Sequence, residues 1–175
     1  MLISKKLEQA MNEQIGHEFH AKLQYVNSAA YFDAEDLPQL AAFFYRQAEE
    51  ENMHAMKFVH YIIDADGQVR IPAMDQPQYD FKSAEEVAQL ALAWENEVTG
   101  QINNLMDMAI QENDHIAQDF LRWFETEQLE EVSTMETLLK TIRRAGDNLL
   151  WVEDFLARTP LGQGQSTSAP EAVAA

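Results

Sequence analysis

Apolar residues recur at intervals of three and four positions along four segments of the chain, each about 28 residues long. Because an α-helix has about 3.6 residues per turn, this spacing gathers the apolar side chains on one helical face. A helix of that length extends about 42 Å. The four apolar seams run from Leu7 to Phe32, from Ala41 to Ile62, from Ala84 to Ala109 and from Ala117 to Ile142. The pattern predicts an all-α protein with four long amphipathic helices.

The connections between these segments predict how the helices pack. The links at 36–38 and 111–114 are short, and short links join antiparallel neighbours. The connection from Asp66 to Lys82 is longer and would reach about 55 Å when extended, enough to cross the full length of the bundle. A flexible loop between antiparallel helices is the alternative, but the length argues against it. We therefore expect a four-helix bundle with one long crossover.

A short fifth helix is predicted after the fourth. Gly146 is of the type that ends a helix, and Asp147 of the type that caps the next one. Apolar residues between Asn148 and Arg158 again follow helical spacing. From Thr159 to Ala175 the composition changes to Gly, Ser, Pro, Gln and Ala. We therefore expect one domain over residues 1–158, followed by a disordered tail.

The chain is strongly acidic: of its 175 residues, 30 are Asp or Glu and 12 are Lys or Arg, for a formal net charge of −18. Such a surface repels phosphate backbones and argues against nucleic-acid binding; it suits cations, although solubility alone would also account for it. The absence of cysteine excludes disulfides, iron–sulfur clusters and thiol catalysis. No apolar run is long enough for a signal peptide or a membrane span, so we expect a cytoplasmic protein.

Polar side chains interrupt the four seams near their midpoints. Glu18, Glu51 and Glu95 lie on the first three helices, and Gln128 and Glu131 lie on the fourth. Helices of equal length packed side by side would bring these groups to one level inside the bundle. Four ionised carboxylates cannot share a dry interior, because each buried charge costs several kcal/mol and the charges repel one another. The four carboxyl groups are therefore protonated, in contact with water, or neutralised by cations. Two Fe²⁺ ions would balance the formal charge of four carboxylates.

A histidine accompanies one of these acids. His54 follows Glu51 by three residues, so both side chains reach the same side of one helical turn. Di-iron bundles use this Glu-x-x-His spacing on an inward face. One imidazole with several carboxylate oxygens suits Fe²⁺ better than structural zinc, which prefers a closed nitrogen and sulfur shell. The other histidines are of the ordinary surface or boundary type: His17, His20, His60 and His115.

Four motifs, one on each predicted helix, resemble those of the bacterial haem-free ferritins, including some that carry bacterioferritin names. They run from Asn12 to Glu18, from Ala48 to His54, from Trp94 to Glu97 and from Trp123 to Glu131. The resemblance covers residues 1–158 and implies a ferritin-like fold. It also implies a hollow shell of 24 identical subunits, in which each bundle oxidises Fe²⁺ with O₂ or H₂O₂ at a ferroxidase centre and the shell stores a ferric mineral.

The resemblance further implies the roles of individual residues at the ferroxidase centre. Glu18, Glu51 and His54 would hold the first iron. Glu51 would bridge to a second iron, which Glu95 and Glu131 would hold.

Residues around this centre also receive roles from the resemblance. Gln128 would lie beside the second iron. Glu50, Glu127 and Glu130 would form a third, weaker iron site toward the cavity, so that ions move inward along carboxylates. Tyr25 would supply an electron or a hydrogen bond near the irons, with a plain packing role as the alternative.

The chain departs from related di-iron proteins at two places. The fourth helix has Gln128-x-x-Glu131 where related enzymes repeat Glu-x-x-His, so the second iron would be held loosely, as a substrate rather than a permanent cofactor. Asn52 occupies the position of the haem-ligating methionine of bacterioferritins, and Met53 is displaced by about 100° around the helix. We therefore expect no haem.

Two other functions compete with iron storage. A di-iron oxidase or peroxidase acting on another substrate would retain its second iron and form no mineral; the rubredoxin-like part that such enzymes often carry needs cysteines, which are absent. A non-enzymatic acidic bundle, such as a DNA-protecting mini-ferritin, is opposed by the net charge, the ligand set within one subunit and the fifth helix.

Overall fold

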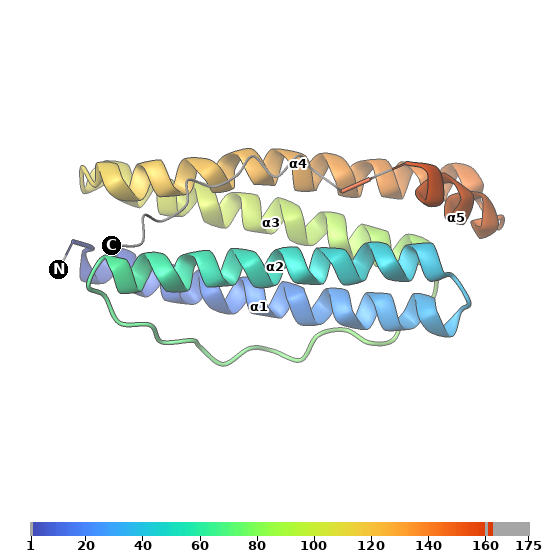
Figure 1. The fold of residues 1–175 in the computed structure, drawn as a ribbon, viewed down its shortest axis with the longest axis horizontal. Coiled ribbons are helices and arrows are strands. Elements are labelled where there is room, and N and C mark those ends of the chain that lie inside the picture. Colours follow the sequence, from blue (N-terminus) through green and yellow to red (C-terminus); the bar gives the residue numbers. More distant parts are fainter. Residues whose placement is uncertain (1, 160, 163–175) are drawn as a thin grey trace.

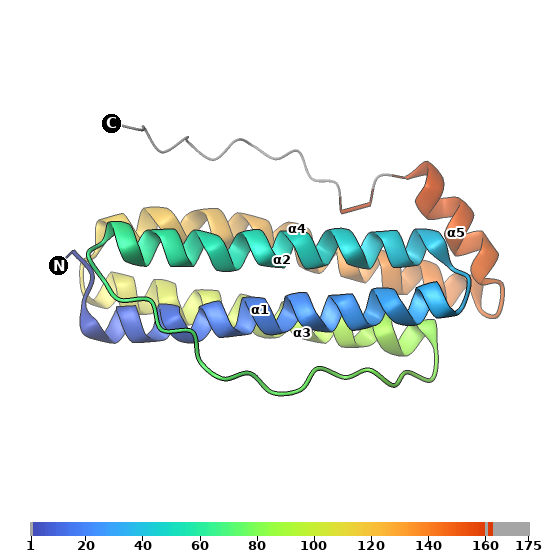
Figure 2. The same cartoon turned by 60° about the horizontal axis from the view of Figure 1, so that its bottom comes forward.

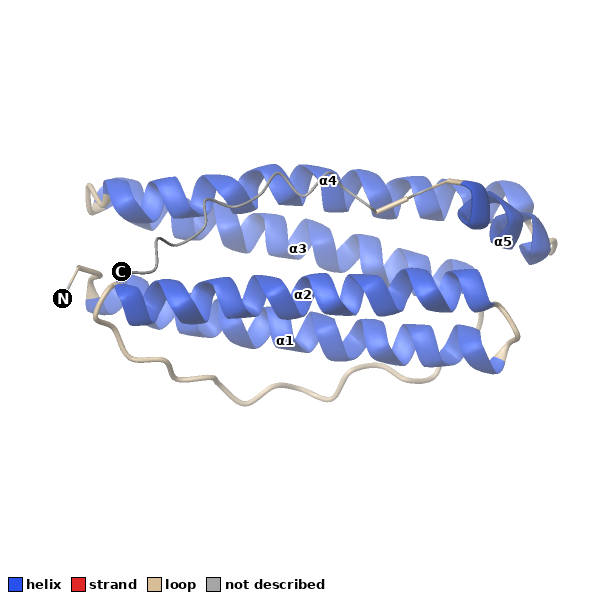
Figure 3. Ribbon diagram, in the orientation of Figure 1, coloured by secondary structure: helices blue, strands red, loops and turns tan. Residues whose placement is uncertain are grey.

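The computed structural model describes residues 2–159 and 161–162. They form five α-helices: α1 Lys5–Ala34, α2 Pro38–Asp64, α3 Ala84–Gln111, α4 His115–Ala145 and α5 Leu149–Arg158. Helix α1 packs against α2 and α3 against α4, α1 also contacts α3, and α5 lies against α2 and α4 at one end of the bundle (Figures 1 and 3). The predicted all-α four-helix bundle with a short fifth helix is therefore confirmed. Among the described helices, none combines the length and apolar character needed to cross a lipid bilayer.

The segment between α2 and α3 runs the length of the bundle beside α1, which confirms the long crossover (Figure 2). Side chains of α1 hold it at two places. Gln24 donates to the carbonyl oxygen of Gln78 at 2.9 Å and accepts from its backbone N–H at 2.8 Å. Asn12 donates to the carbonyl oxygen of Gln68 at 3.0 Å and accepts from the backbone N–H of Arg70. Buried amide side chains thus supply backbone hydrogen bonds to a segment that has no helix or strand of its own.

The helix ends follow local chemistry. Side-chain oxygens of the residues before α1, α3 and α4 accept from backbone N–H groups of the first turns; these residues are Ser4, Ser83 and Asp114. Helix α4 ends at Ala145 and is capped by Gly146, whose φ of 56° lies in the left-handed region that favours glycine. The prediction of Asp147 as the next cap is wrong by one residue. Asn148 takes that position without a side-chain hydrogen bond, because α5 begins at Leu149.

The buried apolar residues form two clusters, one toward each end of the bundle. The cluster near α5 includes Phe32, Phe44 and Leu138. The cluster at the opposite end is centred on residues such as Met11 and Phe58. Every long helix contributes to both clusters, so the middle of the bundle is the one level at which the apolar packing of the described core is interrupted.

Little of the tail expected from Thr159 falls within the described residues. Leu161 packs, partly buried, against the cluster near α5, and a side chain on Gly162 would contact Phe43 and Thr134. The remainder of the predicted tail, with the prediction that it is disordered, lies outside the described residues.

Gly16 lets the crossover approach α1. A Cβ atom at this position would lie 2.4 Å from Cγ of Pro72, closer than two carbon atoms tolerate. We expect Gly16→Ala to lower the free energy of unfolding by about 1–3 kcal/mol, because the crossover must move. The matched control is Gly100→Ala in α3, where a Cβ meets nothing within 4 Å; it should stabilise the protein by about 0.5–1 kcal/mol. Thermal melts of both variants test this, and equal shifts would contradict it.

Candidate metal centre

Polar side chains occupy the level between the two apolar clusters. They come from all four long helices and are almost completely excluded from solvent: Glu18, Glu51, His54, Glu95, Gln128 and Glu131, each at most 6% exposed. The structure therefore brings together the residues that the sequence places at the seam midpoints. The helical periodicity that buries their apolar neighbours also turns these groups inward.

Three of these residues form a compact cluster. His54 Nδ1 lies 3.4 Å from Glu51 Oε2 and 4.0 Å from Glu18 Oε2. One ligand atom from each of the three residues lies within 4.8 Å of the others. Ligand atoms at this spacing surround a point that a single metal ion could occupy, since metal–oxygen and metal–nitrogen distances are about 2 Å.

Several atoms of this level lack a hydrogen-bond partner among the described residues. They are Glu18 Oε2, both ring nitrogens of His54 and Glu95 Oε2. Buried polar atoms are normally paired, and an unpaired one costs about 1–3 kcal/mol. Several unpaired oxygen and nitrogen atoms at one level could instead donate their lone pairs to a divalent cation. A combination of carboxylate oxygen and imidazole nitrogen suits iron.

The other oxygen of Glu18 and that of Glu95 each accept a hydrogen bond. Gln14 Nε2 donates to Glu18 Oε1 at 2.9 Å. The hydroxyl of Tyr25 donates to Glu95 Oε1, so its role includes a direct hydrogen bond as well as packing. These contacts fix one oxygen of Glu18 and one of Glu95 and leave the second oxygen of each without a hydrogen bond, as expected for oriented ligands.

Burial dominates the electrostatics of this level. It raises the pKa of Glu18, Glu51 and Glu131 well above the usual carboxyl value, and mutual repulsion among the carboxylates raises these pKa values further. The pKa of Glu95 is raised to about 7, again by burial, against the lowering effect of the Tyr25 hydrogen bond. Without a cation, the site favours protonated carboxyl groups near neutral pH.

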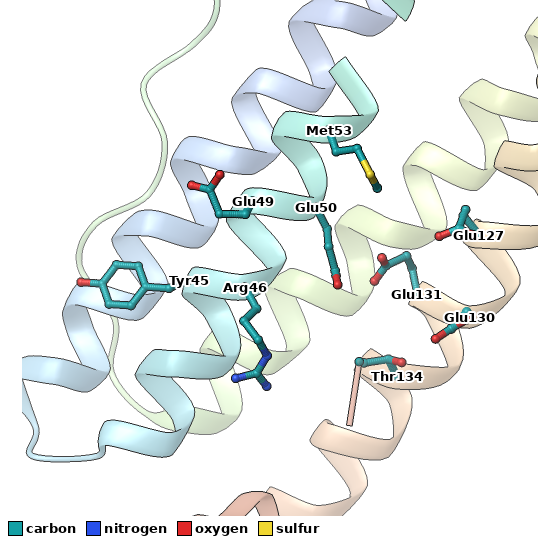
Figure 4. Close-up of a pocket in the computed structure, with 10 residues that line it drawn as sticks. Tyr45, Arg46, Glu49, Glu50, Met53, Glu127, Glu130, Glu131 and Thr134 are labelled. Carbon is teal, nitrogen blue, oxygen red and sulfur yellow. The ribbon is translucent and has the colours of Figure 1, made fainter. Parts of the chain in front are cut away.

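A pocket of about 530 Å³ opens between α2 and α4 beside this level. Glu50, Glu127, Glu130 and Glu131 line it together with Thr134. Figure 4 shows Glu50 and Glu131 pointing toward each other across the gap. Since Glu131 belongs to both the buried level and the pocket wall, it connects the two. Burial raises the pKa of Glu50 to about 7.

The chain matches the family model described as "Ferritin-like domain" over residues 8–145. It belongs to the ferritin family. Ferritin BfrB of Mycolicibacterium smegmatis is 43% identical over 170 residues, which cover 97% of this chain and 94% of that protein. The bacterial non-heme ferritin of Staphylococcus aureus is 38% identical over 162 residues, or 90% and 98% of the two chains. The open pore ferritin from Archaeoglobus fulgidus has a similar fold, with a TM-score of 0.86 at 31% identity over 90% of this chain and 99% of that one.

Sequence reasoning missed three polar residues that form hydrogen bonds to site side chains of this ferritin. Gln14 bonds to Glu18, and Gln47 donates to Glu50. Thr99 donates to the side-chain oxygen of Gln128 at 3.0 Å. The signal that could have found the first two is their spacing of three or four residues from an acid on the same helix. Thr99 bonds across helices, so only the packed structure shows its contact.

Proposed function

We propose that this ferritin oxidises Fe²⁺ to Fe³⁺ at the buried level and stores the product as a ferric oxyhydroxide mineral. The observation that carries the proposal is the convergence of four buried carboxyl groups and one imidazole, with unpartnered ligand atoms, in the middle of an otherwise apolar bundle. Membership of the ferritin family supports iron as the cation. Iron supplies the electrons, and the protein supplies geometry and charge.

Each residue of the level has a role in this proposal. Glu18, Glu51 and His54 hold the first iron, in agreement with their compact arrangement. Glu51 bridges to a second iron, which Glu95 and Glu131 hold. Two Fe²⁺ ions neutralise the four carboxylates, and in this way they remove the repulsion that raises the carboxyl pKa values.

The second iron has the weaker set of ligands. Gln128 stands where an acid would add a negative charge, and its side-chain oxygen is already engaged by Thr99. A loosely held ion is suited to release after oxidation. Glu131 then leads it toward Glu50, Glu127 and Glu130 in the adjoining pocket, which would act as the third site.

Each pair of Fe²⁺ ions gives up two electrons, which reduce O₂ to H₂O₂ or H₂O₂ to water. Hydrolysis of Fe³⁺ during mineral formation releases protons. Tyr25 orients Glu95 through its hydrogen bond and lies close enough to donate an electron. Binding of iron converts the protonated carboxyl groups of the empty site into charged ligands, so loading also releases protons.

The wider assignments are part of the same proposal. The protein would work in the cytoplasm as a shell of 24 copies of this subunit, without haem, nucleic acid or membrane as partner. Asn52, at the position of the haem-ligating methionine, accepts a hydrogen bond from Lys22 at 3.0 Å. This places a cation beside a polar amide where haem binding would need a thioether.

Two measurements on the purified protein test the proposal. Light scattering should give a mass close to 24 subunits, and titration without oxygen should show at least two Fe²⁺ ions bound per subunit. Admission of O₂ should then produce a mineral that stays with the protein. A species that binds two ions tightly and forms no mineral would indicate an oxidase for another substrate. A protein that takes up no iron would exclude ferroxidase activity.

A further inference from the structure

A methionine side chain lines the acidic pocket, the pocket of about 530 Å³ between α2 and α4 that Glu50, Glu127, Glu130 and Glu131 also line. Met53 follows Glu50 by three residues on α2, so both side chains lie over one helical turn. Figure 4 shows the thioether of Met53 directed into the gap that Glu50 and Glu131 also enter. Among the described residues of the pocket wall, Met53 supplies the only sulfur atom. A side chain that is readily oxidised thus lies beside the proposed third iron site.

Packing and metal binding do not account for this methionine. Met53 is 42% exposed, so it fills no part of the apolar core, unlike Met11 and Met135, which are fully buried. Thioether sulfur is a soft ligand that suits Cu⁺, whereas iron in this pocket would take the carboxylate oxygens. The chemical property that remains is the ease with which a thioether is oxidised to the sulfoxide.

The oxidant comes from the reaction proposed for the buried level. Reduction of O₂ by two Fe²⁺ ions gives H₂O₂, which must leave this level through the protein. Glu131 belongs both to the buried level and to the pocket wall, so the acidic pocket adjoins the place where peroxide forms. Iron held there by Glu50 and Glu127 would act as a Lewis acid on the departing peroxide. Peroxide activated in this way reacts near the iron, so proximity decides which side chain is oxidised.

We propose that Met53 is a site of oxidative modification, where peroxide formed during iron oxidation and activated by iron in the acidic pocket converts the thioether to methionine sulfoxide. One oxygen atom of H₂O₂ bonds to sulfur, the O–O bond breaks, and the other oxygen leaves as water with both hydrogens. Sulfur loses two electrons and peroxide gains two. Met53 thereby removes peroxide beside Fe²⁺, and enzymatic reduction of the sulfoxide restores the thioether. This modification depends on the proposed ferroxidase activity, which supplies the peroxide.

A second methionine of nearly equal exposure provides an internal control. Met74 lies on the crossover, is 40% exposed and lines a different pocket, formed by α1, α3 and the crossover. Treatment of the metal-free protein with H₂O₂ gives the intrinsic reactivity of each methionine. Protein that has oxidised Fe²⁺ in air gives the reactivity during turnover. Peptide mass spectrometry measures the sulfoxide fraction at Met53 and Met74 in both samples.

The ratio of the turnover value to the H₂O₂ value should be at least about fivefold higher at Met53 than at Met74, because only Met53 lies beside the activated peroxide. This excess should persist when catalase is present, since catalase removes only the peroxide that has escaped into solution. Equal ratios at the two methionines, or an excess that catalase abolishes, would overturn the proposal.

Two double variants test the part played by iron in the pocket, each compared after the same amount of Fe²⁺ has been oxidised. In Glu50→Gln/Glu127→Gln, neutral amides replace the carboxylates that hold the iron, so the excess at Met53 should disappear. The matched control is Glu49→Gln/Glu136→Gln, which changes one exposed acid on each of the same two helices and should keep the excess. An excess that survives in the first variant would refute the proposal.

The same samples separate this modification from the ferroxidase activity on which it depends. Absorbance of Fe³⁺ shows whether the protein oxidises and retains iron. If the protein oxidises and stores iron while Met53 and Met74 respond alike, only the modification of Met53 is refuted. If the protein does not accelerate iron oxidation, both the ferroxidase activity and the modification are refuted.

Discussion

Alanine in place of His54 or Glu18 should lower the initial rate of Fe²⁺ oxidation by more than about 100-fold, since even residues that only support metal ligands are often worth 10–100-fold. Each substitution removes one of three ligand groups that lie within 4.8 Å of one another. The remaining groups cannot hold the first iron in place. Stopped-flow absorbance of Fe³⁺ after mixing with aerated buffer measures the rate.

The fold of these variants should persist. Glu18 and His54 carry buried polar atoms without partners in the described structure, so their removal takes away a desolvation cost along with the side chain. Circular dichroism should show unchanged helical content. The control is Glu49→Ala: Glu49 is exposed on α2 and, although it lines the acidic pocket, its carboxylate points away from Glu50 and Glu131 (Figure 4). Unchanged oxidation in the His54 and Glu18 variants would remove these residues from the proposed centre.

The metal-free protein should lose stability as the pH rises from about 5 to 8. Burial raises the pKa values of Glu18, Glu51 and Glu131 well above the usual carboxyl value of 4.5, and raises that of Glu95 to about 7. A raised pKa means that the folded state binds more protons than the unfolded state over this range. The buried carboxyl groups therefore make their full contribution to the free energy of unfolding below their pKa in the unfolded state. This contribution is lost as the pH rises through their pKa in the folded state. For Glu95 alone the shift corresponds to roughly 3 kcal/mol.

Urea unfolding at several pH values measures this effect. The formal net charge of −18 also opposes folding at high pH, so a variant must isolate the contribution of the buried level. Glu131→Gln removes one buried charge and should flatten the pH dependence, whereas Glu49→Gln at the surface should leave it unchanged. A wild-type stability that rises with pH over this range would contradict the assignment of raised pKa values.

Divalent metal should reverse the loss at pH 8, because it binds the deprotonated carboxylates of the folded state. At a free concentration about 100 times the dissociation constant, a single site adds about 2.7 kcal/mol. The Glu18→Ala/His54→Ala variant should gain less than the wild type under the same conditions.

The periodicity of the sequence predicts much of the fold. The four seams predict the four long helices, and the length of the 66–82 segment predicts the crossover, because both follow from fixed helical and chain dimensions. The polar positions at the seam midpoints predict the buried level for the same reason. The cap of α5 was misplaced, since Asp147 and Asn148 are both suitable cap residues and helical geometry alone does not choose between them.

Contacts between side chains of different helices cannot be predicted from the sequence pattern. The sequence left the role of Tyr25 open, and packing decided that its hydroxyl meets Glu95 on another helix. His17 and His20, which are of the ordinary boundary type in the sequence, line a pocket whose other wall is the crossover. Periodicity fixes the direction of a side chain from its own helix. Its partner depends on the rotation and spacing of neighbouring elements, which only the tertiary structure sets.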